Sequence, residues 1–123
     1  MSIINKYVIY SAMKWEIIYY SENIEQQILA LPNDLKAHYL RLADLMEMYG
    51  PHLKPPHTKA MGNGLFELRL KGHEGIARVF YCTIIGRKIV MLNSFIKKSQ
   101  KTPRKELDTA TKRMNEVKKN ADA

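Results

Sequence analysis

Three largely apolar segments follow one another closely in the second half of the chain, and they constrain the fold more than any other feature. They are residues 65–70, 75–84 and 87–96, and short connectors that contain glycine separate them. Connectors this short suit β-hairpins, in which neighbouring strands run antiparallel. The sequence therefore predicts a three-stranded antiparallel meander.

The first half of the chain supplies elements that could cover this meander. Residues 15–20 are aromatic and β-branched and predict another strand, and Ser21 is a suitable N-cap for the short helix expected after it. A second helix is predicted to begin near Asp34 and to end at Gly50-Pro51. Its apolar residues alternate at spacings of four and three, as on one helix face: Leu35, Tyr39, Leu42, Met46 and Tyr49.

A third helix is predicted at residues 103–118, with Thr102 as its N-cap and Pro103 at its first position. Residues 51–64, which are rich in proline and glycine, are expected to form a loop. The expected fold class is α+β. The first strand and the meander form a small antiparallel sheet, a helical hairpin packs on it, and a C-terminal helix follows.

One domain is expected over residues 13–119, which suits a chain of 123 residues. Residues 1–12 form an extension that the pattern does not assign to the domain. Residues 120–123 are expected to be a frayed tail.

The net charge of +8 is unevenly distributed along the chain. Residues 1–50 hold four Lys/Arg and six Asp/Glu, a net −2, whereas residues 51–123 hold sixteen and six, a net +10. A one-sided positive field attracts an anionic partner, which by charge alone is a nucleic acid or an acidic protein. With one cysteine, no apolar run of about 20 residues and no signal-peptide pattern, the cytoplasm is the expected compartment, with no membrane partner.

Charged residues within the meander are the first candidates for function. Side chains alternate along a strand, so Glu67 and Arg69 are expected on the face opposite Phe66 and Leu68. Arg78 lies in a strongly apolar strand, where an unpaired charge would be costly to bury. Its expected partner is either Glu67 or the phosphate of a ligand.

Cleavage of RNA through its own 2′-hydroxyl would use these residue types. Arginine forks match phosphate geometry, the base would be Glu67, a lysine or Tyr81, and an aromatic ring can stack on a nucleobase. The run at 95–103 would be a solvated basic linker if taken alone, but beside the arginines it favours an RNA site. The candidate catalytic residues are Glu67, Arg69, Arg78, Tyr81, Lys97 and Lys98, and the candidate RNA-binding residues are Lys59, Phe95 and Lys101.

The four histidines lie on a predicted helix or in loops, outside the predicted sheet. Neither a metal site nor a histidine acid–base pair is therefore expected.

Three stretches carry a family resemblance. They are Gly-Leu-Phe-Glu-Leu-Arg at 64–69, Arg-Val-Phe-Tyr at 78–81, and Phe-Ile-Lys-Lys-Ser-Gln-Lys-Thr-Pro at 95–103. In this order they resemble the phage-derived, HigB-like branch of the RelE/ParE toxin superfamily, over about residues 14–118. The predicted order of elements matches the RelE-like fold.

The resemblance implies the toxin of a type II toxin–antitoxin system. Such a toxin is a ribosome-dependent endoribonuclease, or mRNA interferase, that cleaves translated mRNA in the A site without a metal or other cofactor. The implied partners are a HigA-like helix-turn-helix antitoxin, the ribosome and mRNA, with operator DNA bound only through the antitoxin. By motif position, the resemblance places the family's basic site residues at Lys59, Arg69, Arg78, Lys97 and Lys98.

Two departures and two alternatives accompany this resemblance. The sheet has no histidine to serve as the general acid of some members, which favours a lysine, and the family pattern does not account for residues 1–12. The alternatives are a ParE-like poison of DNA gyrase that acts by protein–protein contact, and a basic RNA-binding domain without catalysis. The retained arginines and Lys97-Lys98 favour the nuclease.

Overall fold

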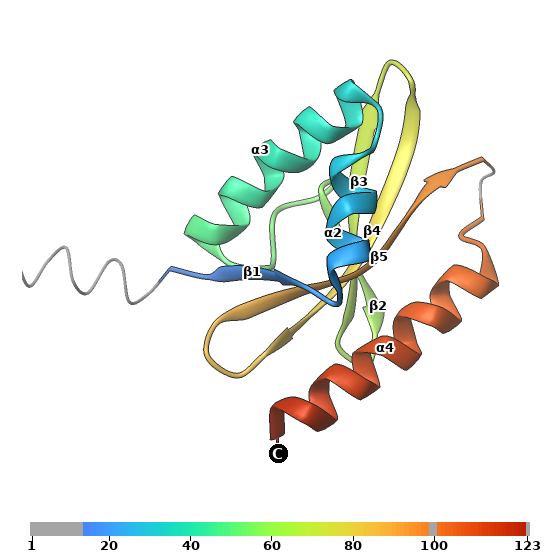
Figure 1. The fold of residues 1–123 in the computed structure, drawn as a ribbon. Coiled ribbons are helices and arrows are strands. Elements are labelled where there is room, and N and C mark those ends of the chain that lie inside the picture. The colour runs from blue at the N-terminus through green and yellow to red at the C-terminus, as the bar shows by residue number, and fades with distance from the viewer. Residues whose placement is uncertain (1–13, 99–100, 123) are drawn as a thin grey trace, which may run out of the picture.

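The computed structural model describes residues 14–98 and 101–122, and it has helices on both faces of a five-stranded sheet (Figure 1). The sheet has the strand order β1-β5-β4-β3-β2. The elements follow the chain as β1 (Glu16–Tyr19), α2 (Glu22–Leu29), α3 (Asn33–Tyr49), β2 (Thr58–Gly62), β3 (Leu65–Gly72), β4 (Gly75–Ile84), β5 (Lys88–Lys97) and α4 (Arg104–Asp122). The predicted α+β class is confirmed.

The meander forms as predicted, but the first strand joins it in an unexpected direction. β3, β4 and β5 are antiparallel neighbours, whereas β1 lies parallel to β5, with Ile17 opposite Ile89. The prediction of a purely antiparallel sheet is therefore wrong at this edge. A parallel neighbour requires a long connection, and the whole segment from α2 to β4 supplies it.

The segment predicted as a loop at 51–64 contains a fifth strand. β2 pairs antiparallel with β3, and Lys59 lies opposite Glu67. The sequence Thr-Lys-Ala-Met-Gly lacks apolar alternation because this short edge strand is largely exposed.

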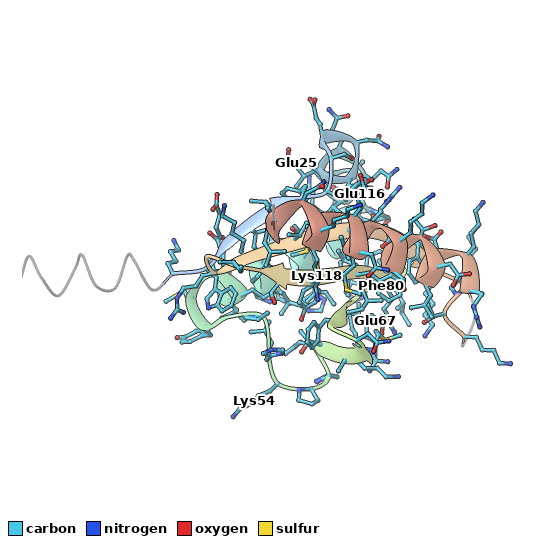
Figure 2. The ribbon with its side chains drawn as sticks, turned by 90° about the horizontal axis from the view of Figure 1, so that it is seen from below. Glu25, Lys54, Glu67, Phe80, Glu116 and Lys118 are labelled. Carbon is cyan, nitrogen blue, oxygen red and sulfur yellow. The ribbon has the colours of Figure 1, made fainter. Side chains whose placement is uncertain are left out.

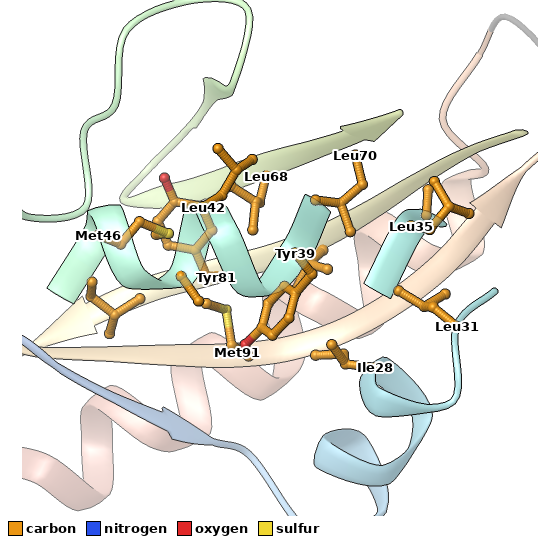
Figure 3. Packing of buried hydrophobic residues seen from close by; sticks show 14 of the residues in the cluster. Ile28, Leu31, Leu35, Tyr39, Leu42, Met46, Leu68, Leu70, Tyr81 and Met91 are labelled. Carbon is orange, nitrogen blue, oxygen red and sulfur yellow. The ribbon is translucent and has the colours of Figure 1, made fainter. Parts of the chain in front are cut away.

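Helices α2 and α3 cover one face of the sheet and bury the larger core (Figures 1 and 3). Ser21 caps α2 as predicted, because its Oγ accepts a hydrogen bond from the Ile24 N–H at 3.2 Å. The predicted stripe of α3 is buried from Leu35 to Met46, but Tyr49 at its end is 72% exposed. Gly50, with φ of 97°, follows the helix where a β-carbon would come within 3.2 Å of Trp15.

Helix α4 lies on the opposite face and closes a smaller core around Phe80, Leu92 and Met114. It begins at Arg104 and continues to Asp122, beyond the predicted end. The sequence predicted that Thr102 caps this helix. In the structure its hydroxyl donates to Glu67 Oε2 on β3 at 3.4 Å. Among the residues that the structure describes, no helix is long and apolar enough to cross a membrane.

Candidate active site

A charged cluster lies on the α4 side of the sheet, where β3 and β4 are neighbours. Arg69 lies opposite Arg78, Arg78 lies opposite Phe95, and Glu67 lies opposite Phe80. Directly paired residues share one face of a sheet, so register alone brings Glu67, Arg69 and Arg78 together. Figure 2 shows Glu67 and Phe80 beside α4.

Glu67 is the centre of this cluster. Its Oε1 lies 3.5 Å from Arg78 Nε and 3.7 Å from Arg69 Nε, while its Oε2 accepts the Thr102 hydroxyl. The Glu67 and Arg78 side chains are 4% and 7% exposed, whereas that of Arg69 is 37% exposed. One buried carboxylate therefore holds a buried and a half-exposed guanidinium together, and it is the partner of Arg78 that the sequence left undecided.

Arg78 keeps unused capacity for hydrogen bonding. Its Nη1 donates to the Ala77 carbonyl at 3.1 Å, but its buried Nε has no hydrogen-bond partner. Burial lowers the pKa of this guanidinium, Glu67 opposes that effect, and Arg69 adds to it. That Nε lies 3.5 Å from Glu67 Oε1, so one carboxylate is shared between two guanidinium groups, and this excess of positive charge favours an incoming anion.

The lysine candidates lie on β2, at the end of β5 and in the segment after it. Lys59 is exposed on β2, opposite Glu67, and Lys97 ends β5, opposite Ile76. Lys98 and Lys101 are exposed beyond that strand. Their surroundings fit contact with a phosphate backbone, and their roles remain predictions.

Phe95 is more deeply packed than a free stacking platform would be. Its ring centroid lies 5.7 Å from that of Phe80, and it packs against the core under α4. It is partly exposed beside Arg78. Part of one ring therefore remains available at the site, and its role in stacking on a base remains a prediction.

The placement of Tyr81 corrects one prediction. Tyr81 points to the α2/α3 side, is fully buried, and donates its hydroxyl to the Pro51 carbonyl at 2.5 Å. Burial raises the pKa of this phenol. Because the sheet separates it from Arg69 and Arg78, Tyr81 is a core residue and cannot take a proton from a ligand bound there.

Two histidines lie beside the arginines, which sequence reasoning missed. A cleft of about 330 Å³ is lined by His38, Pro56, His57, Arg69, Lys71, Ile76 and Arg78. The main chain fixes His57 there, because its carbonyl accepts the Arg69 N–H at 2.8 Å. The pairing of the residues before β2 with β3 creates this neighbourhood, and the sequence showed no sign of that strand.

His38 reaches the same place from α3. Its Nδ1 accepts the Lys71 N–H at 3.0 Å, and its ring lies edge-on to His57 with centroids 6.1 Å apart. Burial lowers the pKa of His38, and the neighbouring Arg41 and His57 lower it further. A neutral imidazole suits its role as a hydrogen-bond acceptor.

Comparisons with known proteins agree with the geometry. The family model described as Phage derived protein Gp49-like (DUF891) matches residues 26–115. The crystal structure of the archaeal RelE–RelB complex from Pyrococcus horikoshii OT3 contains a chain that superposes with a TM-score of 0.50 at 18% identity. The superposition covers 68% of this chain and 96% of the archaeal one.

A comparison with curated proteins finds no match. The structural likeness shows the fold, and the family model covers most of the chain, including β3, β4 and β5. The chain therefore belongs to the phage-derived Gp49-like family and has the RelE-like fold.

Proposed function

We propose that this protein is the toxin of a toxin–antitoxin pair and that it arrests translation by cutting mRNA on the ribosome. The observation that carries the proposal is the paired Arg69 and Arg78, held by Glu67 on one face of the sheet. The buried Nε of Arg78 faces Glu67 Oε1 at 3.5 Å without forming a hydrogen bond, and Arg69 is partly exposed beside it. Such a pair suits a phosphate whose negative charge increases during reaction.

The proposed reaction is attack by a 2′-hydroxyl on the neighbouring phosphorus. The 2′-oxygen gives its proton to a lysine side chain and bonds to phosphorus, the bond to the 5′-oxygen breaks, and that oxygen takes a proton from a second lysine. Arg69 and Arg78 stabilise the phosphorane. The contacts of Glu67 with both arginines favour a positioning role for this carboxylate, and Lys97 or Lys98 is the proposed acid.

The proposed partners follow from the fold and from the charge. The archaeal neighbour is a RelE–RelB complex, which supports an antitoxin partner for this chain, and we propose a HigA-like helix-turn-helix protein. The net charge of +8 favours the ribosome and its mRNA as the target. This target places the protein in the cytoplasm.

Primer extension on mRNA from programmed ribosomes tests the proposal. Wild-type protein should produce cuts within the A-site codon, and Arg69→Ala should reduce cutting by roughly 10²-fold or more, as expected when a transition-state donor is lost. Lys112→Ala on α4 is the matched control, because it removes one exposed positive charge away from the cluster.

Two results would contradict the proposal. Intact mRNA together with DNA-damage signalling would indicate a gyrase poison. Equal cutting of the same RNA without ribosomes would contradict ribosome dependence.

A further inference from the structure

The open edge of β3 is lined by cations well beyond the arginine pair. β2 pairs with β3 only as far as Leu68, so beyond Leu68 β3 is paired with β4 on one edge and has no described strand on the other. The cleft of about 330 Å³ beside Arg69 and Arg78 adjoins a second hollow of about 500 Å³, because His38 and Lys71 line both. Each volume lies within the roughly 300–1,000 Å³ of ligand sites, and the two adjoining hollows lie along this edge.

The charge of the two hollows selects for an anion. The cations that line them are Arg41, Arg69, Lys71 and Arg78, and the lining carboxylate is Asp34. Asp34 Oδ2 already accepts a hydrogen bond from the His73 N–H at 3.2 Å. The cationic side chains that line the hollows therefore outnumber the carboxylates. The rings of His38 and His57 add flat surfaces between the cations, which is how sites for single-stranded nucleic acid are built.

The backbone of this edge argues against a peptide as the occupant. A peptide that added a strand would need free N–H groups on β3. Those of Arg69, Lys71 and His73 already donate to the His57 carbonyl, His38 Nδ1 and Asp34 Oδ2. An occupant must therefore be bound through side chains, and these are mainly cationic.

We propose that the two hollows form a track for single-stranded RNA, which binds phosphates on one side of the scissile bond through Lys71 and Arg41. This inference rests on the proposed function and extends it from one phosphate to a strand of several nucleotides. The track starts at Arg69 and Arg78, passes His57 and His38, and ends near Asp34 and His73 on α3 and the β3–β4 hairpin.

The test measures binding of 2′-O-methyl RNA, which cannot be cut, to the full chain by fluorescence anisotropy at several salt concentrations. The logarithm of the binding constant falls linearly with the logarithm of the salt concentration, and we call the steepness of this line the salt slope. For a single strand, each lost phosphate contact should lower the salt slope by about 0.7. Arg41→Ala/Lys71→Ala should therefore lower the slope for a seven-nucleotide RNA by about 1.4. Between 50 and 200 mM salt, the wild type should lose about sevenfold more affinity than this variant.

Lys112→Ala/Lys119→Ala is the matched control, because it removes the same charge from exposed positions on α4. A three-nucleotide RNA, too short to follow the track, should show little difference between the two double variants. Equal slopes for the two double variants with the longer RNA would overturn the track. Equally tight, length-dependent binding of an acidic peptide of the same charge would also overturn it.

Failure of the track is distinguishable from failure of the proposed function. If mRNA is cut on programmed ribosomes but the wild type and the Arg41→Ala/Lys71→Ala variant have the same salt slope, only the proposed track is overturned. A slope that depends on both residues, without any cutting, would support the track and overturn the nuclease.

Discussion

The two faces of the sheet are covered to different extents. The face under α2 and α3 stabilises the fold, whereas the face under α4 also holds the candidate active site. On one face, α2 and α3 bury a continuous apolar layer from Ile24 to Met91, and its polar groups are paired internally, as in the hydrogen bond of 2.7 Å between the Tyr19 and Tyr39 hydroxyls. On the other face, α4 is the one helix among the described residues that covers the core around Phe80, and it leaves Arg69 partly exposed. A charged site can persist in a small sheet when one helix covers only part of a face.

The largest expected loss of stability comes from a mutation that creates a cavity in the core under α2 and α3. Leu68 is fully buried under α3, so Leu68→Ala should lower the free energy of unfolding by about 2–5 kcal/mol. Arg69→Ala, the next residue but on the other face, should change it by about 1 kcal/mol or less. Urea denaturation of both variants measures the contrast, and equal losses would contradict the division between the faces.

The second effect concerns the carboxylate that holds the arginines. Glu67→Gln leaves Arg78 buried without its opposite charge and should cost about 3 kcal/mol or less. Inorganic phosphate should then raise the urea midpoint of this variant more than that of the wild type, because an anion can replace the lost charge. Glu74→Gln in the exposed hairpin is the control, and the same phosphate response in all three proteins would count against an anion site at Arg78.

A smaller loss of stability is expected from a change at Tyr81, which is buried on the face that α2 and α3 cover. Tyr81→Phe removes the donor to the buried Pro51 carbonyl and should cost about 1–2 kcal/mol of stability. Cutting per folded molecule should be unchanged in the ribosome assay. Tyr49→Phe, at an exposed position, serves as the control. Loss of cutting in folded Tyr81→Phe would restore this residue to the site.

The smallest effect is a dependence of stability on pH that arises at the β3 edge. The folded state lowers the pKa of His38 below its usual 6.5, so the unfolded chain takes up the proton first as the pH falls. Stability should be full above about pH 7 and should fall as the pH drops through 6.5 toward the lowered pKa. His38→Gln keeps an acceptor for the Lys71 N–H and should weaken this dependence in urea titrations at several pH values, whereas an unchanged dependence would assign it to other groups.

Local pattern was sufficient for the elements whose neighbours in sequence are also their neighbours in space. The strand predicted at 75–84 has the observed bounds of β4, and the alternation of β3 correctly placed Glu67 and Arg69 together. Alternation along β4 puts Tyr81 and Arg78 on different faces of the sheet. The inclusion of Tyr81 among the catalytic candidates was an error of chemistry rather than of fold.

The features that were missed depend on contacts between distant segments. β2 is polar and short, and it is a strand because β3 pairs with it. His38 and His57 meet because α3 and the segment before β2 converge on one strand edge, 19 residues apart in the chain. No local periodicity encodes such a meeting, because its stabilisation comes from tertiary packing.

The parallel pairing of β1 with β5 also sets an order of assembly during synthesis. β1 leaves the ribosome before β5, its partner strand, has been made, and the other strands that the structure describes lie between them in the chain. Long-range pairing of this kind delays folding. The arginine pair on β3 and β4 can meet before β5 is made, whereas α4, which covers part of their face of the sheet, is synthesised after β5. A nascent copy therefore forms the arginine pair before β1 can join the sheet.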